Sequence, residues 1–252
     1  MPTLLLIRHG HVEGIAPERF RGRSDLKLTA LGRGQARAVA AYIRRRWPGT
    51  QAVYASPLSR CRDTAAAIAT ALGLGVRTVD GLADLDYGAW QGLARAETAA
   101  RWPGLVDRWF VAPHRVRIPD GEALLDLAAR ASRALATCLD RAPAEATIAV
   151  VAHDSVNRVL LCEALGLPLA QYWRLRQDPC CVNVIEAGSE FRVALLNGID
   201  HLAGVPDQAG GGACQGPGRN RVLTGPAFGR YAMNWLWRWS PPLTALRADD
   251  SS

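Results

Sequence analysis

The sequence predicts an α/β protein, a three-layer αβα sandwich with a mostly parallel central sheet. Short apolar runs typical of buried strands alternate with longer segments whose apolar residues recur at helical spacing, as in parallel sheets covered by helices on both faces. Two of the apolar runs, over residues 4–7 and 147–152, lead directly into Arg8-His9 and His153. Ligands of open α/β sheets bind beyond the carboxyl ends of the strands, so these strand ends mark the candidate site.

The first half of the chain alternates strands and helices with clear start and stop signals. A charged loop without periodicity covers residues 11–28, and ordered loops of this length are usually functional. A helix is expected from the N-cap residue Thr29 to Trp47, because apolar residues recur at helical spacing and a Pro-Gly pair follows. A short buried strand over residues 52–55 and a helix over residues 57–72 come next.

The second half repeats this alternation and ends in an antiparallel hairpin. In order, the pattern predicts a strand at 76–79, a loop at 80–93, short helices at 94–102 and 104–110, a longer helix near 120–141, a strand at 147–152 and a helix at 155–165. Residues 181–187 and 190–196, separated by a Gly-Ser pair, predict the hairpin.

Length and composition fit one large domain with a C-terminal extension. The chain has 252 residues, of which 49% are hydrophobic, enough to bury a core without a disulfide or a metal. We expect the domain over residues 1–200. The extension over residues 201–252 combines Gly-rich, linker-like segments with a tryptophan-rich stretch at 235–239. We favour its packing or poor order over binding at a membrane surface, and packing on a second copy leaves a homodimer open.

Charge and targeting signals narrow the possible partners. The formal net charge is +7, but the arginines are scattered apart from the run at 44–46, so we expect no nucleic-acid partner. The six cysteines have neither zinc-site nor redox-pair spacing, so no metal site is predicted. Since no basic segment precedes the first apolar run, which is itself too short to cross a membrane, we expect a cytoplasmic protein without a membrane partner.

The residues at the predicted strand ends suit an oxyanion. Arg60 lies in the first turn of the helix expected at 57–72, where the helix N-terminus itself favours an anion. Parallel strands would bring Arg8, His9, Arg60 and His153 to one point. Such a group of cations and hydrogen-bond donors is what a dianionic phosphoryl group needs in a site without a metal.

Six short motifs occur in the order and spacing of one family. They are Arg8-His9-Gly10, Asp25-x-x-Leu28-Thr29-x-x-Gly32-x-x-Gln35-Ala36, Ser56-x-Leu58-x-Arg60-x-x-x-Thr64-Ala65, Gly88-x-Trp90-x-Gly92, Asp120-Gly121-Glu122 and Val150-Val151-Ala152-His153. With these motifs, residues 3–197 resemble the histidine phosphatase superfamily, also called phosphoglycerate-mutase-like. The middle region looks most like the α-ribazole-phosphatase-type and broad-specificity members of its phosphatase branch.

The resemblance implies a mechanism that needs neither a metal nor a cofactor. His9 would be the nucleophile, attacking phosphorus to give a phosphohistidine. Arg8, Arg60 and His153 would hold the phosphate oxygens and stabilise the charge in transfer, with His153 counted among the catalytic residues. The partner would be a small phosphorylated metabolite.

A proton donor must also protonate the leaving alkoxide and then activate water. The family usually supplies a glutamate four residues before the glycine of the Gly-x-Trp motif. That position is Asp84 in this chain, and Asp86 is the alternative. Because aspartate is one methylene shorter than glutamate, the loop must bring its carboxyl group closer.

Further positions depart from the pattern of the family. His11 stands where Glu or Gln is common, and Ile15 stands where a phosphate-binding Asn is often found. Arg21, with the neighbouring arginines of its loop, could take over that anion contact or be solvated. Asp154 follows the second histidine where glycine is usual, and an acid there disfavours highly anionic substrates. We therefore expect His11 and Asp154 to influence specificity.

The function expected is that of a metal-independent phosphomonoester hydrolase that acts through a phosphohistidine. The mutases that the chain resembles carry a longer insertion with adjacent arginines after the Trp-Gly loop. Residues 93–119 are short here and contain Arg115 and Arg117 but no adjacent pair. Two alternatives remain, namely phosphoglycerate-mutase-type phosphoryl transfer and a non-catalytic phosphate-binding member of the fold.

Overall fold

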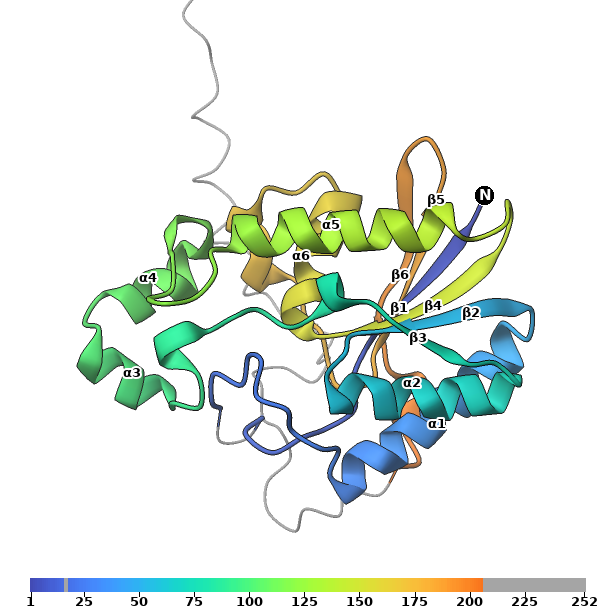
Figure 1. Cartoon of the computed structure of the whole chain (residues 1–252), viewed down its shortest axis with the longest axis horizontal. Coiled ribbons are helices and arrows are strands. Elements are labelled where there is room, and N and C mark those ends of the chain that lie inside the picture. Colours follow the sequence, from blue (N-terminus) through green and yellow to red (C-terminus); the bar gives the residue numbers. More distant parts are fainter. Residues whose placement is uncertain (16–17, 206–252) are drawn as a thin grey trace, which may run out of the picture. The chain divides into compact units, whose positions relative to one another are not determined.

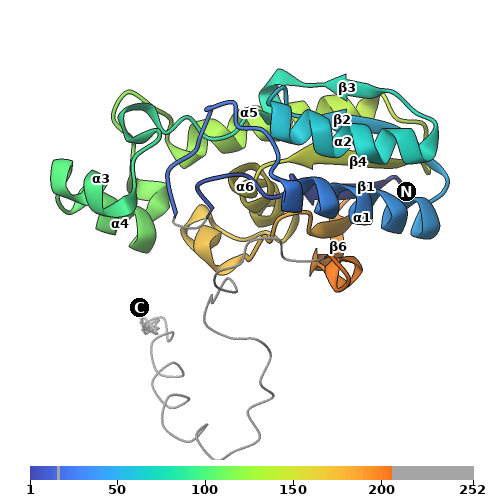
Figure 2. The same ribbon diagram turned by 90° about the horizontal axis from the view of Figure 1, so that it is seen from below.

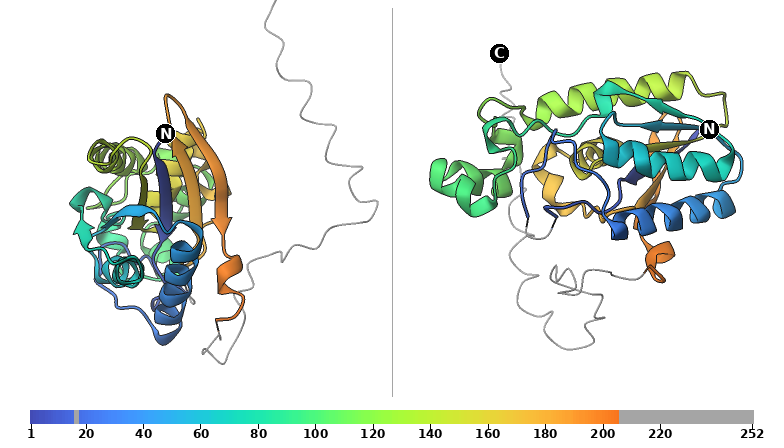
Figure 3. Two further views of the ribbon diagram at one scale, coloured as in Figure 1. Left: turned by 90° about the vertical axis from the view of Figure 1, so that its right-hand side faces the viewer. Right: turned by 60° about the horizontal axis from the view of Figure 1, so that its bottom comes forward.

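A computed structural model describes residues 1–15 and 18–205, and most of the extension predicted over residues 201–252 lies outside the described residues. The fold is built on a six-stranded sheet with the order β3-β2-β4-β1-β5-β6. The strands are β1 (Thr3–Arg8), β2 (Thr50–Ala55), β3 (Val76–Thr78), β4 (Thr147–Ala152), β5 (Val182–Ala187) and β6 (Phe191–Gly198). The expected hairpin is formed by β5 and β6, which lie together on one side of β1 (Figure 3).

Strand direction and register bring the predicted site residues to one edge of the sheet. β1 pairs with β4 in parallel, β4 with β2, and β2 with β3, whereas β5 is antiparallel to β1. Arg8 lies opposite Ala152, and Ala55 lies opposite Val151. The residues that follow β1, β2 and β4 therefore emerge side by side, and the predicted mostly parallel sheet is confirmed.

Helices cover both faces of the sheet (Figure 1). α1 (Ala30–Arg46) and α2 (Ser59–Leu72) pack on one face, and α5 (Leu124–Asp140) and α6 (Asp154–Ala164) pack on the other. Alternate residues of β1 contact the two layers, Leu5 and Ile7 on the α1–α2 side and Leu4 and Leu6 on the α5–α6 side. Since all four are fully buried, the unbroken apolar run of this strand is explained by burial on both faces.

The predicted helix near 120–141 starts later than expected, at Leu124. Asp120 has a left-handed backbone with φ 55°, which a continuing helix does not allow. A β-bridge between Arg117 and Ala123 closes a tight loop ahead of the helix. Residues 117–123 thus form a turn that packs on the Asp86–Gly88 segment, where Glu122 N donates to Asp86 O at 3.0 Å.

Two short helices, α3 (Arg95–Arg101) and α4 (Leu105–Val111), lie beyond the carboxyl ends of the parallel strands (Figure 2). Aromatic packing holds α4 to the rest of the domain, because the fully buried Trp109 meets the ring of Trp173 at a centroid distance of 5.7 Å. Among the described residues there are also five 3-10 helices, at Asp80–Leu82, Gly88–Trp90, Pro113–Arg115, Leu169–Arg174 and Asp200–Leu202. Within the described part of the chain, no helix combines the length and apolar character needed to cross a membrane.

The turn after β1 depends on a close contact between two glycines. Thr29 caps α1 as predicted, accepting a hydrogen bond from Gly32 N at 3.1 Å. A Cβ added to Gly10 would lie 2.6 Å from Gly32 O, and one added to Gly32 would lie 2.1 Å from His11 O. Gly10 is therefore required by the approach of another backbone segment, which sets where His9 lies.

Replacing Gly32 with alanine tests this contact through the sign of the stability change. Helix propensity alone would stabilise the protein by up to ~1 kcal/mol, whereas the clash with His11 predicts a loss of about 1 to 3 kcal/mol in the free energy of unfolding. Gly34→Ala is the matched control in the same helix, because its added Cβ meets two side-chain atoms and no backbone, Val205 Cγ1 at 3.2 Å and Arg37 Nη2 at 4.0 Å. Urea unfolding measures both variants, and a Gly32→Ala protein as stable as Gly34→Ala contradicts the proposed contact.

Candidate active site

Arg60 brings the predicted site residues together. It is the second residue of α2 and is fully buried. Its Nε donates to His9 Nε2 and to His153 Nδ1, each at 3.2 Å. Its Nη2 lies 3.0 Å from Asp84 Oδ2. One guanidinium thus contacts three side chains that the sequence predicted to share a site.

The local fold explains why Arg60 holds this position. Asp25 accepts hydrogen bonds from Ser59 N at 2.7 Å and from Ser59 Oγ at 2.8 Å, so a loop carboxylate caps the start of α2. The carbonyl groups of Ser24 and Gly22 accept from Arg60 Nη1 and Nη2, each at 2.7 Å. The long loop after β1 is therefore fastened to the start of α2 on both sides of Arg60.

His9 is oriented as a nucleophile requires. Its Nδ1 lies 2.7 Å from Gly10 O, a group that can only accept, so Nδ1 carries the proton and Nε2 carries the lone pair. Burial, with the charges of Arg60 and Arg8 and the His153 imidazole, holds the pKa of His9 well below its usual range. The imidazole is therefore neutral near pH 7, with Nε2 turned toward Arg60.

His153 lies beside His9, with the two ring centroids 5.2 Å apart. Its Nε2 is 2.8 Å from Ser56 Oγ, and its Nδ1 accepts from Arg60. Burial and the charge of Arg60 hold the pKa of His153 well below its usual range as well. Ser56 belongs to one of the sequence motifs, and the structure shows why: its hydroxyl orients the second histidine.

Arg8 lies at the end of β1 and is nearly buried, with 6% of the residue exposed. Its Nη1 donates to Gln177 O at 2.5 Å. Within residues 1–15 and 18–205, no acceptor faces its buried Nε. A buried guanidinium with an unused donor beside a histidine is suited to bind an anion.

The structure separates the two candidate proton donors. Asp84 is buried, and its Oδ2 lies near Arg60 and 3.4 Å from His153 Nδ1. Its Oδ1 accepts from Leu85 N at 2.9 Å and from the Ser155 hydroxyl. Burial raises the pKa of Asp84 above its usual range, although the charge of Arg60 opposes this shift. A carboxyl group with a raised pKa beside the histidines is suited to general acid catalysis.

Asp86 has structural contacts instead. Its Oδ1 accepts from Gly88 N at 2.9 Å, and its Oδ2 pairs with Arg23 at 3.3 Å. These bonds shape the turn that carries the Gly88–Trp90 segment. The geometry therefore supports Asp84 as the proton donor, as expected from its position in the motif.

Arg130 of α5, which sequence reasoning missed, holds the Asp84 loop. Its guanidinium donates to three carbonyl groups, Gly81 O at 3.0 Å, Ala83 O at 2.6 Å and Asp84 O at 2.8 Å. It also pairs with Glu122 at 2.7 Å, which explains the motif at residues 120–122. No local pattern marks Arg130, because the carbonyls that it binds lie 46 to 49 residues away along the chain.

Asp154 is the first residue of α6 and lines a small pocket beside the two histidines. Although burial alone would raise its pKa, the charges of Arg8, Arg158 and Arg21 together hold the pKa of Asp154 well below its usual range. The pKa values of Asp84 and Asp154 are thus shifted in opposite directions. The pocket is lined by Glu18, Arg19, Phe20, Arg21, Gly22, Asp84, Tyr87, Phe110, Asp154 and Trp173.

Arg21 and His11, which the sequence also predicted at the site, form hydrogen bonds to neighbouring segments. Arg21 lines the pocket, and its Nη1 donates to Gly14 O at 2.6 Å. His11 Nδ1 lies 2.9 Å from Thr29 Oγ1, and its backbone nitrogen donates to the side chain of Gln35 at 2.8 Å. His11 therefore links the turn after β1 to the start of α1. Whether it contacts substrate stays a prediction.

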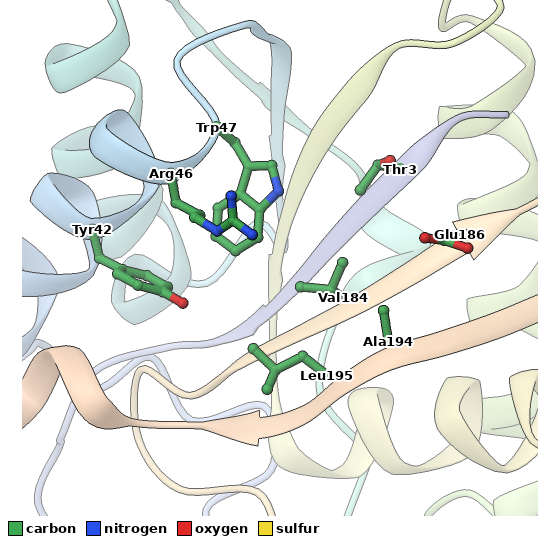
Figure 4. Close-up of a pocket in the computed structure, with 8 residues that line it drawn as sticks. All are labelled: Thr3, Tyr42, Arg46, Trp47, Val184, Glu186, Ala194 and Leu195. Carbon is green, nitrogen blue, oxygen red and sulfur yellow. The ribbon is translucent and has the colours of Figure 1, made fainter.

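A second pocket lies at the amino end of the strands (Figure 4). Tyr42, Arg46 and Trp47 line it from the end of α1 and the residue that follows, and Thr3 and Glu186 line it from β1 and β5. Thr3 begins the strand whose last residue is Arg8. This pocket is therefore separated from the histidines by the length of β1, and no predicted site residue lines it.

The chain is similar in sequence to several known proteins. The bifunctional protein Rv2228c of Mycobacterium tuberculosis is 37% identical over 204 residues, an alignment that covers 80% of this chain and 55% of that protein. The chain thus spans about half the length of that curated relative. Phosphoserine phosphatase 1 of Hydrogenobacter thermophilus is 32% identical over 203 residues, covering 80% of this chain and 95% of the relative. A probable phosphoglycerate mutase, GpmB of an Enterobacter species, is 33% identical, with 80% of this chain and 95% of that protein covered.

A solved structure with a similar fold and a family profile support the same relationship. The solved structure of YhfR from Bacillus stearothermophilus superposes with a TM-score of 0.75 and 27% identity, covering 80% of this chain and all of that one. The profile described as Histidine phosphatase superfamily (branch 1) matches residues 4–198, the segment that carries all of the site residues described above. The chain therefore belongs to the histidine phosphatase superfamily, branch 1.

Proposed function

We propose that this protein hydrolyses phosphomonoesters of small metabolites through a phosphohistidine at His9, without a metal. The observation that carries the proposal is the orientation of His9, whose bond from Nδ1 to Gly10 O leaves the Nε2 lone pair beside Arg60 Nε at 3.2 Å. Arg8 and Arg60 supply the positive charge that the transferred phosphoryl group requires.

In the first step, His9 Nε2 attacks phosphorus and the bond from phosphorus to the ester oxygen breaks. In its protonated form, which the raised pKa favours, Asp84 gives its proton to the leaving alkoxide. In the second step, the Asp84 carboxylate takes a proton from water as the water oxygen attacks phosphorus. The N–P bond breaks, phosphate leaves, and His9 and Asp84 return to their starting states.

Hydrolysis is favoured over phosphoglycerate-mutase-type transfer by the charge of the pocket. A mutase must hold a bisphosphate, and its substrates carry a carboxylate as well as phosphate. Asp154 places a negative charge in the wall of the pocket, and this charge opposes such substrates. Two relatives of this chain carry the names phosphoserine phosphatase 1 and probable phosphoglycerate mutase.

A phosphate-release screen over a panel of phosphorylated metabolites and p-nitrophenyl phosphate, with a chelator and no added metal, tests this function. Release of phosphate by the wild-type protein is the expected result. If no member of the panel is hydrolysed, the hydrolase proposal is wrong. If 3-phosphoglycerate is isomerised without release of phosphate, the mutase alternative replaces it.

The expected pH dependence of kcat/KM follows from the shifted pKa values of His9 and Asp84. His9 must be neutral, so activity rises with pH through its pKa, which lies below the usual value of 6.5. Asp84 must be protonated for poor leaving groups, so activity falls as pH rises through its pKa, which lies above 3.8. We expect a bell-shaped profile for an alkyl phosphate. Asp84→Asn should remove its alkaline limb, and an unchanged limb would assign that ionisation to another group.

A further inference from the structure

The pocket that contains Asp84 is where the leaving alcohol must lie. A proton donor has to come within hydrogen-bond distance of the ester oxygen, so the carbon atoms attached to that oxygen extend into the space beside Asp84. The aromatic residues Tyr87, Phe110 and Trp173 line it together with charged residues that include Asp154. The chemical character of this wall therefore selects the alcohol part of the substrate.

Asp154 reaches this pocket with unused capacity to accept hydrogen bonds. Its side chain is 25% exposed, and its Oδ2 lies 3.8 Å from Arg158 Nη2. In the described part of the chain, this ion pair is its only short polar contact, and no donor forms a hydrogen bond to the carboxylate. Because an ionised carboxylate can accept about four hydrogen bonds, a ligand in the pocket would find acceptors at Asp154.

Arg158 lies near the carboxylate and packs on two aromatic rings. The Arg158 guanidinium lies 4.7 Å from the ring centroid of Trp173 and 5.2 Å from that of Tyr172. It thus connects Asp154, one turn earlier on α6, to an aromatic residue of the same pocket wall. The attraction between the two charges favours a position of the carboxylate near Arg158 and Trp173.

The cations of the pocket are held by other partners. Arg19 pairs with Glu97 at 3.3 Å, and Arg21 Nη1 donates to a backbone carbonyl. Once phosphate neutralises Arg8 and Arg60, Asp154 remains a negative charge of the wall with free acceptor capacity, in addition to the exposed Glu18. A second carboxylate brought into so small a space would be repelled by it.

We infer that Asp154 determines specificity, selecting phosphomonoesters whose alcohol part carries a neutral or cationic hydrogen-bond donor and rejecting those that carry a carboxylate. This inference rests on the proposed hydrolase function. A hydroxyl and an ammonium group share the chemistry that Asp154 recognises, and the test below distinguishes them.

A series of short substrates that differ in one group tests the inference. The series is 2-hydroxyethyl phosphate, 2-aminoethyl phosphate and 2-phosphoglycolate, which present a hydroxyl, an ammonium and a carboxylate at similar positions. We expect the wild-type kcat/KM for the hydroxyl and ammonium compounds to exceed that for phosphoglycolate roughly tenfold or more, equivalent to about 1.4 kcal/mol. Whichever of 2-hydroxyethyl phosphate and 2-aminoethyl phosphate has the higher kcat/KM shows whether Asp154 prefers a hydroxyl or an ammonium group.

Asp154→Asn should lower these preference ratios roughly tenfold, while Asp140→Asn, which removes an exposed charge at the end of α5, should leave them unchanged. Ratios within one variant are independent of its folded fraction and of any general effect on Arg8. If the wild-type protein shows no preference, or if Asp154→Asn keeps it, the inference is overturned. Hydrolysis of p-nitrophenyl phosphate by the wild-type protein separates that outcome from failure of the hydrolase proposal.

Discussion

Replacing His9 with alanine is expected to lower kcat/KM for phosphomonoesters roughly 10⁴-fold or more, a loss typical of removing a nucleophile from a concerted group of residues. The structure gives the reason, since Nε2 of His9 is the nitrogen that faces both Arg60 and the second histidine. Its pKa is lowered, so the wild-type imidazole is ready to attack near pH 7.

His114→Ala is the control for this measurement, because His114 is exposed in the 3-10 helix Pro113–Arg115. Steady-state hydrolysis of p-nitrophenyl phosphate compares the two variants. The His114→Ala protein should keep wild-type activity. Retention of more than about a tenth of the activity by the His9→Ala protein would rule out a covalent role for His9.

Asp84→Asn is expected to cost roughly 10² to 10⁴-fold in kcat for alkyl phosphates, the usual contribution of general acid–base catalysis. The loss should be much smaller for p-nitrophenyl phosphate, whose leaving group needs little protonation. Asparagine keeps the size of the side chain, but its single amide oxygen can accept only one of the two hydrogen bonds that Arg60 and Leu85 N donate to the carboxylate. Dependence of the loss on the leaving group is the signature of a proton donor.

Asp86→Asn provides the matched control two residues along the same loop. Its carboxylate contacts Gly88 N and Arg23 rather than the histidines, so its loss should affect stability more than the dependence on the leaving group. Turnover of both substrate types by each variant separates the two carboxylates. If Asp86→Asn abolished turnover of alkyl phosphates while Asp84→Asn kept it, the assignment of Asp84 would be reversed.

The central architecture and the centre of the site could be predicted because both follow from local signals. An unbroken apolar run ending in Arg8-His9 indicates a strand that is buried on both faces and terminates at a ligand-binding edge. The strand ending at His153 carries the same signal. Parallel pairing in register then brings both ends together, as the alignment of Arg8 with Ala152 shows.

The supporting residues could not be predicted, since nothing local marks them. Arg130 holds the loop of Asp84 through backbone carbonyls, which no side-chain pattern reports. Gly10 belongs to a motif, but its close approach to Gly32 joins two segments that are distant in sequence and appears only in the structure. The start of α5 was placed too early because the left-handed conformation of Asp120 is set by packing around Glu122.

The two acids of the site show why chemical roles required the structure. The resemblance placed Asp84 as the proton donor and Asp154 at a position that influences specificity, but it gave no physical reason for the difference. Burial raises the pKa of Asp84, whereas three arginines outweigh burial and lower that of Asp154. The first is thereby suited to donate a proton and the second to remain a fixed negative charge, a division of labour set by environment.

Trapping the covalent intermediate tests the central proposal most directly. The wild-type protein would be mixed with a radiolabelled phosphomonoester and quenched with denaturant within a turnover. We predict label that survives alkali, is lost in acid and maps to the peptide containing His9, with none on the His9→Ala protein. Absence of label from a wild-type protein that releases phosphate, or label that persists in His9→Ala, would contradict the phosphohistidine mechanism.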